Sequence, residues 1–330
     1  MIDGRFLLSA VLAILTLVGC YADNPMLMEM ETFLSKMPKD LQARQAKAIY
    51  EAINGDSQAL DEIRLGRTPS IVLPDDVDTL RVREDILLFS PSGSRHGEKT
   101  PMLIYLHGGG WTFGSINSCS RFCSAVASNG IIVAAVNYPL APEHSAVQIV
   151  DYVDETVRFI SDKAESWGAR SGSVSLGGDS SGGNLALVST LRNPGLLKSL
   201  VLFYPVTDVR AEARCNSEYA EGYGNDEVVM KAFCASYLGD NPDMQTLPWV
   251  SPVFADERQL ASLPPILLVA AQCDILCSQG KVFAQRVASV GGDIRRVELS
   301  GTTHLFITVP GQPTAFNRSV DLTVDFIRNN

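Results

Sequence analysis

The feature that most constrains this chain is a short apolar strand that runs into a glycine-rich turn. Ser173 to Leu176 has the composition of a buried strand, Gly177 to Gly183 follows it, and a helix-like segment begins directly afterwards. The turn contains Gly178-Asp179-Ser180-Ser181-Gly182, the Gly-x-Ser-x-Gly pattern that places a serine on a tight strand-to-helix turn. This context predicts a nucleophilic serine at the end of a strand.

Two neighbouring serines compete for that role. Ser180 has glycine two residues before and two residues after it, whereas Ser181 has Asp179 two residues before it. Because side chains at those positions would clash with the adjoining strand and helix, we assign the nucleophile to Ser180. A phosphate-binding loop is the alternative for such a run, but the spacing matches neither the lysine-containing P-loop nor Gly-x-Gly-x-x-Gly.

A serine hydroxyl needs a histidine base, and the base needs a carboxylate that fixes its tautomer. Among the four histidines, only His304 follows Ser180 in the order Ser, Asp or Glu, His. Asp274 directly follows the strand-like segment Ile266 to Ala271, so we favour it as the acid. Asp293 is the alternative, but it lies in a turn expected at the opposite edge of the sheet.

Negative charge that develops on an ester oxygen needs backbone N–H donors. The strand-like segment ending at Leu106 is followed by His107-Gly108-Gly109-Gly110-Trp111, whose glycines allow a close approach to substrate. We expect Gly108, Gly109 and Ser181 to supply the oxyanion donors. Candidate pocket walls follow these motifs, namely Trp111, Phe113, Leu305 and Phe306, although the first two aromatic residues could equally be buried core.

Short apolar runs alternate with helix-like segments from Leu80 onward, which is typical of a mostly parallel sheet flanked by helices. The rhythm stops between Thr207 and Leu263, where Glu227 to Leu238 reads as a helix, and Met26 to Ile63 also reads as helical. We therefore expect a core of residues 68–206 and 264–330, with a helical cap formed by 26–67 and the insertion 207–263.

Together, His-Gly-Gly-Gly-Trp, Gly-Asp-Ser-Ser-Gly-Gly, the segment Asn137 to His144, Asp274 and His304 resemble the hormone-sensitive-lipase-like family of esterases. The resemblance covers Leu80 to the carboxyl terminus. It implies an α/β-hydrolase fold with a two-part helical cap, no cofactor, and cleavage of carboxylic esters with short to medium acyl chains. It also implies that Glu143 and His144 are structural supports.

Three positions depart from that family's pattern. Ser181 stands where alanine is usual, Pro139 replaces an arginine, and Leu305 replaces a frequent glycine and is expected to narrow the pocket.

The amino terminus has the pattern of an export signal. Arg5 precedes an apolar run from Phe6 to Val18, which is too short for the roughly 20 residues of a spanning helix. Residues 1–20 are therefore predicted to be a signal peptide. Because Leu17 to Cys20 resembles a lipobox, Cys20 is a candidate lipidation site and the protein is predicted to be a membrane-anchored lipoprotein. Secretion, periplasmic release and an uncleaved amino-terminal helix are the alternatives.

Charge and cysteine content limit the partners. The formal net charge of -10 does not favour nucleic acid, which requires clustered Lys and Arg. Seven cysteines would leave six after lipidation, and these could pair in an oxidising compartment or stay as buried thiols. A metal site is disfavoured because no histidine lies near the cysteine pairs.

The residues thus predict a serine carboxylesterase that forms an acyl-enzyme and accepts an uncharged small-molecule ester under the cap. A ligand-binding protein on the same fold that no longer catalyses is the alternative from another class. Such proteins can lose the catalytic histidine, whereas this chain retains His304. An amidase or deacetylase is the alternative among enzymes.

Overall fold

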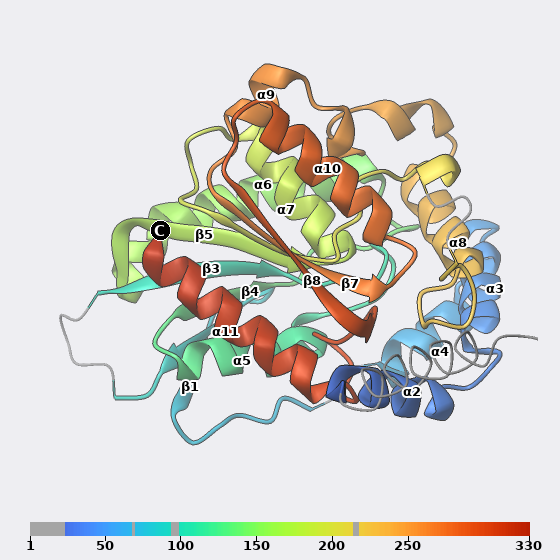
Figure 1. The fold of residues 1–330 in the computed structure, drawn as a ribbon, viewed down its shortest axis with the longest axis horizontal. Helices are drawn as coiled ribbons and strands as arrows, with labels where there is room; N and C mark the ends of the chain where they lie inside the picture. Colours follow the sequence, from blue (N-terminus) through green and yellow to red (C-terminus); the bar gives the residue numbers. More distant parts are fainter. Residues whose placement is uncertain (1–23, 68–69, 94–98, 214–217) are drawn as a thin grey trace, which may run out of the picture.

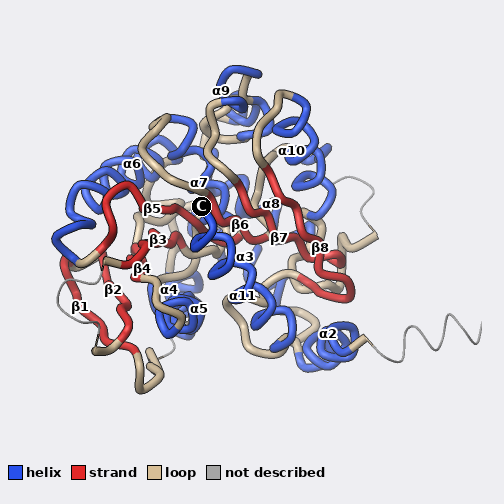
Figure 2. The backbone as a smooth tube through the Cα atoms, turned by 60° about the vertical axis from the view of Figure 1, so that its left-hand side comes forward, coloured by secondary structure: helices blue, strands red, loops and turns tan. Residues whose placement is uncertain are grey.

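The computed structural model describes residues 24–67, 70–93, 99–213 and 218–330, which form a twisted sheet with helices on both faces (Figures 1 and 2). Within these residues the sheet has eight strands in the order β1-β2-β4-β3-β5-β6-β7-β8. The strands are β1 (Val77–Arg83), β2 (Ile86–Pro91), β3 (Thr100–Leu106), β4 (Ile132–Val136), β5 (Ala169–Asp179), β6 (Leu200–Phe203), β7 (Ile266–Cys273) and β8 (Ile294–Thr303). β2 pairs antiparallel with β1 and β4, and the other pairs are parallel. The mostly parallel α/β-hydrolase sheet expected from the sequence is confirmed.

Two hydrophobic cores fill the space between the sheet and its helices. One face is covered by α6 (Ala146–Lys163), α7 (Ser181–Arg192) and α10 (Cys277–Ser289), and the other by α5 (Ile116–Ser128) and α11 (Pro313–Asn329) (Figure 1). Along β3, Ile104 and Leu106 face the first core, whereas Leu103 and Tyr105 face the second. This alternation is the two-residue period of a strand buried on both faces.

A helical cap covers the carboxyl-terminal edge of the parallel strands. It contains α3 (Leu41–Ile53), α4 (Gln58–Gly66) and α8 (Glu227–Leu238), and α3 packs against α8 although they are far apart in sequence (Figure 1). By contrast, α2 (Pro25–Lys36) packs against β8 and α11, and α9 (Glu257–Ala261) lies beside α10. The segment 207–263 therefore contributes to both cap and core.

Helix breakers divide the amino-terminal helical segment. The expected helical stretch Met26 to Ile63 forms α2, α3 and α4, with Pro38 and Gly55 in the two interruptions. Short helical turns complete the described structure, namely η1 (Ala164–Trp167), η2 (Ala211–Ala213), η3 (Pro242–Thr246) and η4 (Pro252–Phe254).

The predicted signal segment 1–20, including Cys20, lies outside the described residues. Within the described ranges, no helix is both long and apolar enough to cross a membrane.

Candidate active site

Ser180 lies at the point where β5 ends and α7 begins. Its backbone has φ 54° and ψ -118°, in the left-handed half of the Ramachandran plot that non-glycine residues rarely occupy. A side chain at Gly178 would place its Cβ 2.5 Å from the carbonyl oxygen of Leu106, and one at Gly182 would overlap the same oxygen. The two glycines therefore allow the sharp turn that exposes the serine hydroxyl at the sheet edge.

The structure brings the three predicted triad side chains into one hydrogen-bonded chain. Ser180 Oγ lies 3.0 Å from His304 Nε2, and His304 Nδ1 lies 2.7 Å from Asp274 Oδ2. All three residues are buried, with exposed fractions of 7%, 2% and 2% for Ser180, His304 and Asp274. The alternative acid, Asp293, lies at the other edge, where its carbonyl accepts the N–H of Ile266 at the start of β7.

Two further donors hold the Asp274 carboxylate. Oδ1 accepts the backbone N–H of Leu276 at 3.2 Å and the Asn225 amide at 3.4 Å, while Oδ2 faces His304. Asn225 comes from the insertion just before α8, so the cap side of the chain contributes to the orientation of the acid. The sequence carried no signal for this contact.

His304 is held by the segment that leads into α11. Gln312 accepts the N–H of Thr303 at 3.0 Å through Oε1, and its amide nitrogen donates to the His304 carbonyl at 3.3 Å. The imidazole also packs on the Tyr204 ring, with 4.2 Å between ring centroids. These contacts fix both backbone and ring, which is the preorganisation that a general base needs.

The glycine loop after β3 requires a correction to the predicted oxyanion donors. The Gly108 N–H donates to Asp179 Oδ1 at 3.0 Å, so this group is already used inside the protein. No described residue accepts the N–H groups of Gly109, Gly110 or Ser181. The predicted pair of loop donors therefore moves by one residue, from Gly108 and Gly109 to Gly109 and Gly110.

Asp179 acts as the anchor of this loop. Its Oδ1 accepts both the Gly108 N–H and the Tyr105 hydroxyl, each at 3.0 Å. Burial raises the pKa of Asp179 to about 6, although the two donors oppose the shift. The Asp179 carboxyl thus holds the backbone of the glycine loop in place at Gly108. This role explains why an acidic residue follows Gly178 in a buried turn.

The backbone conformation and the packing of the cap explain why positions 109 and 110 are glycine. Gly109 has φ 122° and Gly110 has φ 63°, values that favour glycine. A Cβ at Gly110 would overlap the ring of Phe233, which comes from α8. The cap therefore packs directly on the loop that presents the N–H groups.

His107, directly before these glycines, is a support for the loop. Its ring stacks on Tyr138 with centroids 4.3 Å apart, and the Tyr138 hydroxyl donates to the His107 carbonyl at 2.6 Å. Burial lowers the pKa of His107 to about 4, so its ring is neutral at neutral pH.

A cavity of about 330 Å³ opens above Ser180. Two of the four predicted wall residues, Phe113 and Leu305, line it. The other two are corrected to core residues, because Trp111 is fully buried against Tyr237 of α8 and Phe306 is fully buried against Tyr204. Leu305 has φ 74°, a conformation that glycine adopts more easily.

One arginine fastens the cap to the core. Arg64 of α4 makes a two-pronged ion pair with Glu143, at 2.7 and 2.9 Å, and donates to the carbonyls of Thr112 and Ala141 at 3.0 and 2.9 Å. Glu143 thus has the structural role that the resemblance implied. The His144 side chain is exposed, and its backbone N–H donates to the Leu140 carbonyl.

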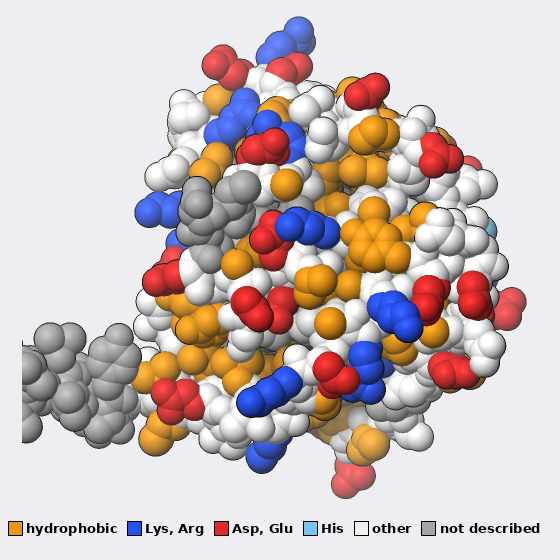
Figure 3. All heavy atoms as spheres, turned by 90° about the vertical axis from the view of Figure 1, so that its right-hand side faces the viewer, with side chains coloured by type: hydrophobic (Ala, Val, Ile, Leu, Met, Phe, Trp, Pro, Cys, Tyr) orange, Lys and Arg blue, Asp and Glu red, His pale blue; other side chains and the backbone are white. Residues whose placement is uncertain are grey.

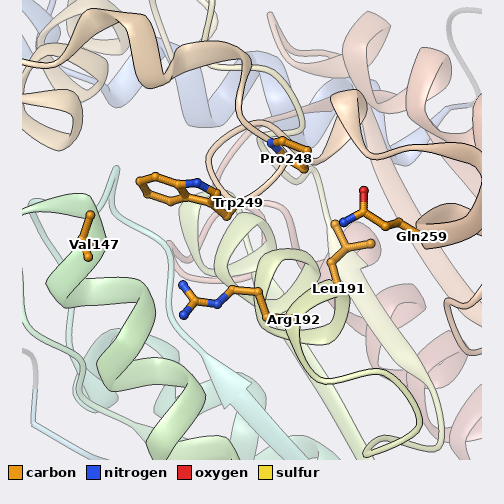
Figure 4. Close-up of a pocket in the computed structure, with 6 residues that line it drawn as sticks. All are labelled: Val147, Leu191, Arg192, Pro248, Trp249 and Gln259. Atoms are coloured by element: carbon orange, nitrogen blue, oxygen red, sulfur yellow. The ribbon is translucent and has the colours of Figure 1, made fainter.

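A second cavity, of about 420 Å³, lies away from this site. Figure 4 shows its lining, which consists of Val147, Leu191, Arg192, Pro248, Trp249 and Gln259. Its one charged group, Arg192, is already paired with Asp151 and Asp154 at 2.6 and 2.8 Å. This lining offers no nucleophile with a base, so it does not compete with the Ser180 site.

The described cysteines and acidic side chains form no additional centre. None of the five described cysteines forms a disulfide, and the sulfurs of Cys119 and Cys123 lie 3.8 Å apart. Within the described ranges, no group of three or more potential ligands is placed to hold a metal ion.

Comparison with known proteins decides the family. Residues 103–308 match the family model described as the alpha/beta hydrolase fold. The chain belongs to the hormone-sensitive-lipase-like family of α/β-hydrolases. The match spans the glycine loop, the nucleophile turn, Asp274 and His304, and so covers every predicted catalytic group.

Individual proteins are also similar to this chain over most of its length. A putative alpha/beta hydrolase of Acanthamoeba polyphaga mimivirus is 27% identical over 87% of this chain and 83% of its own length. The carboxylic ester hydrolase LipN of Mycobacterium tuberculosis is 31% identical over 67% of this chain, which spans 60% of that relative. The hyperthermophilic esterase of Pyrobaculum calidifontis superimposes with a TM-score of 0.73 at 26% identity, covering 89% of this chain and 99% of the other.

Proposed function

We propose that this protein is a serine carboxylesterase that hydrolyses short- to medium-chain carboxylic esters through an acyl-enzyme. The observation that carries the proposal is the continuous hydrogen-bonded chain from Ser180 through His304 to Asp274. Beside it lie the N–H groups of Gly109, Gly110 and Ser181, for which no described residue is an acceptor. Two similar proteins, a carboxylic ester hydrolase and an esterase, support the same reaction class.

In the first half-reaction, Ser180 Oγ attacks the ester carbonyl carbon while His304 Nε2 takes the hydroxyl proton. Asp274 accepts a hydrogen bond from the Nδ1–H of His304 and stabilises the imidazolium. The N–H groups of Gly109, Gly110 and Ser181 receive the oxyanion, and each such donor contributes about 10²- to 10³-fold in rate. The C–O bond then breaks, and the alcohol leaves with the proton from His304.

In the second half-reaction, water replaces the alcohol. His304 removes a proton from the water as its oxygen attacks the acyl carbon. The bond between that carbon and Ser180 Oγ then breaks, His304 returns the proton to Ser180 Oγ, and the carboxylic acid is released. No cofactor enters this sequence of steps. A cavity of about 330 Å³ lies at the small end of the usual range for ligand sites, which favours short to medium acyl chains.

The test is hydrolysis of p-nitrophenyl esters of increasing acyl length by wild type, Ser180→Ala and Ser128→Ala. Ser128 is a matched control because it lies on α5 and its hydroxyl donates to Asp76. We expect a burst of p-nitrophenol in wild type and in Ser128→Ala, and a loss of about 10⁴-fold or more in Ser180→Ala. Equal rates in wild type and Ser180→Ala would refute the proposal.

The same assay separates the alternatives. A wild type that binds esters and hydrolyses none would favour a binding protein, and faster cleavage of matched anilides than of esters would favour an amidase.

We also propose that residues 1–20 direct export and that Cys20 becomes lipidated. Support comes from the apolar run and lipobox-like residues in the sequence. Mass analysis of the mature amino terminus tests this, because an intact Met1 would contradict it.

A further inference from the structure

A positively charged side chain from the cap lies in the cavity above Ser180. Arg67 directly follows the last residue of α4, and its guanidinium carbon lies 4.6 Å from the centroid of the Phe113 ring. Both residues line the same cavity as Ser180 and His304. An arginine is therefore held at the substrate site by a residue that follows the glycine loop.

No described carboxylate neutralises Arg67. The ion pairs of the described residues include the neighbouring Arg64, which holds Glu143 and Asp61, but none includes Arg67. Burial lowers the pKa of Arg67, and no acidic neighbour opposes that shift. A partly buried cation without an anion is unfavourable, because desolvation is then not offset by pairing. An anionic ligand would supply the missing partner.

An unpaired amide lies in the same cavity. Gln45 of α3 is 2% exposed, lines the cavity, and has no hydrogen-bond partner for its Nε2 atom among the described residues. Gln42, one turn earlier on the same helix, also lines the cavity, but its Nε2 donates to the Gly224 carbonyl at 2.9 Å. Buried amides are normally paired, so the Gln45 donor is an exception that a ligand would explain.

The other described charged groups of the cavity and of the outer face do not provide a partner for Arg67. Asp179 is the acidic residue among the described residues that line the cavity. Its Oδ1 accepts hydrogen bonds from the Tyr105 hydroxyl and the Gly108 N–H. Figure 3 shows acidic and basic side chains interspersed over the face that carries the cap. Since that outer face carries both signs of charge, selection for charge would have to occur inside the cavity.

We propose that Arg67 and Gln45 form a subsite for a carboxylate, and that preferred substrates are esters with a carboxylate remote from the scissile bond. This inference rests on the proposed esterase function and replaces the sequence-based expectation of an uncharged ester. The planar guanidinium matches the two oxygens of a carboxylate, and the Gln45 amide adds a neutral donor. The cation also neutralises charge that would otherwise disfavour entry of an anionic substrate.

Matched pairs of esters test the subsite. Mono-p-nitrophenyl succinate and p-nitrophenyl isocaproate have acyl groups of the same shape, but the first ends in a carboxylate and the second in an isopropyl group. For the alcohol side, p-acetoxybenzoate and p-isopropylphenyl acetate form the equivalent pair. The quantity compared is the ratio of kcat/KM for the charged ester to kcat/KM for its neutral partner.

Wild type should favour the charged member of at least one pair by about tenfold or more, since hydrogen bonds to charged groups are among the stronger ones. Arg67→Gln should lower that ratio about 10- to 100-fold, and Arg67→Lys should retain part of it. Arg170→Gln is the charge-matched control, because Arg170 is exposed at the start of β5, at the far end of the strand from Ser180. It should leave the ratio unchanged. A wild-type ratio below one for both pairs, or an equal ratio in Arg67→Gln, would overturn the subsite.

Direct binding separates failure of the subsite from failure of the esterase function. Succinate titrated calorimetrically into Ser180→Ala should bind, and the double variant with Arg67→Gln should not. If wild type hydrolyses no ester, the proposed function fails while this binding result still decides the subsite. Efficient hydrolysis of neutral esters without succinate binding would retain the function and refute the subsite.

Discussion

The cavity above Ser180 has two walls that differ in origin and in how well their polar groups are satisfied. The wall at the sheet edge carries Ser180 and His304, whose side chains lie 3.0 Å apart, and Asp274 supports His304 from behind at 2.7 Å. The cap wall carries Arg67 and Gln45, for which no described residue supplies an ion pair or a partner for Nε2, respectively. The triad side chains are thus paired without a ligand, whereas Arg67 and the Gln45 amide would gain a partner from the proposed carboxylate.

This difference suggests that the sheet-edge wall serves catalysis and the cap wall serves substrate selection. Preorganised groups at the sheet edge need no rearrangement when charge develops, which is the condition for efficient electrostatic stabilisation. Unpaired donors on the cap gain a partner only when a suitable substrate enters, so they contribute to selection. Variants on the two walls should therefore change different kinetic quantities.

The largest effect is expected at the sheet edge, in Asp274→Asn. The substitution removes the carboxylate that holds His304 Nδ1, and we expect kcat for a p-nitrophenyl ester to fall about 10⁴-fold. Asp293→Asn is the matched control, since Asp293 lies at the opposite edge of β7. A comparable loss in Asp293→Asn, or none in Asp274→Asn, would contradict the assignment.

The next effect concerns stability of the loop beneath the sheet-edge wall. Because burial raises the pKa of Asp179 from 3.8 to about 6, the folded state holds its proton to higher pH than the unfolded state. The free energy of unfolding should therefore decrease by about 3 kcal/mol as pH rises across that window. Asp179→Asn should lack this component in urea unfolding measured at a series of pH values. An identical pH dependence in both proteins would show that the carboxyl does not titrate there.

A smaller effect is expected where the two walls are joined. Arg64→Ala removes the Glu143 pair and two hydrogen bonds to loop carbonyls, and should lower the free energy of unfolding by about 2 kcal/mol. Arg44→Ala is the control, because Arg44 makes one exposed ion pair with Asp40, and should cost less than about 0.5 kcal/mol. Equal losses in thermal or denaturant unfolding would argue against Arg64 as the fastening residue.

The smallest effect is expected from Leu305→Gly. Glycine relieves a positive φ that costs about 1 kcal/mol and removes a side chain from the cavity. We expect kcat/KM to rise a few fold for longer acyl chains relative to acetate, without loss of kcat for acetate. An unchanged acyl-length profile would show that Leu305 does not limit the cavity.

The sheet-edge wall was predictable because local patterns identify its residues. Ser180 follows from glycine spacing, His304 from chain order, and Asp274 from its place after a strand. Gly108 was misassigned because the availability of an N–H depends on where the Asp179 carboxylate lies, which no spacing reveals. Trp111 illustrates the same limit, since an aromatic residue after a loop can face a cavity or pack inward against a helix such as α8.

Among the helices and strands too, those with a clear local pattern are predictable from the sequence and the others are not. The buried segment Ile266 to Ala271 predicts most of β7, and Glu227 to Leu238 predicts α8 over its full length. The edge strand β1 was missed, because most of its residues are exposed and lack an apolar run. Arg67 and Gln45 carried no sequence signal, since their meaning depends on the packing of α3 and α4 over a cavity formed by distant segments.

The most direct test of the central claim is covalent labelling with a fluorophosphonate followed by peptide mass mapping. We expect one adduct per chain, on Ser180, with labelling slowed strongly in His304→Ala and accompanied by loss of esterase activity. An adduct on Ser181, or full esterase activity in a protein labelled at Ser180, would contradict it.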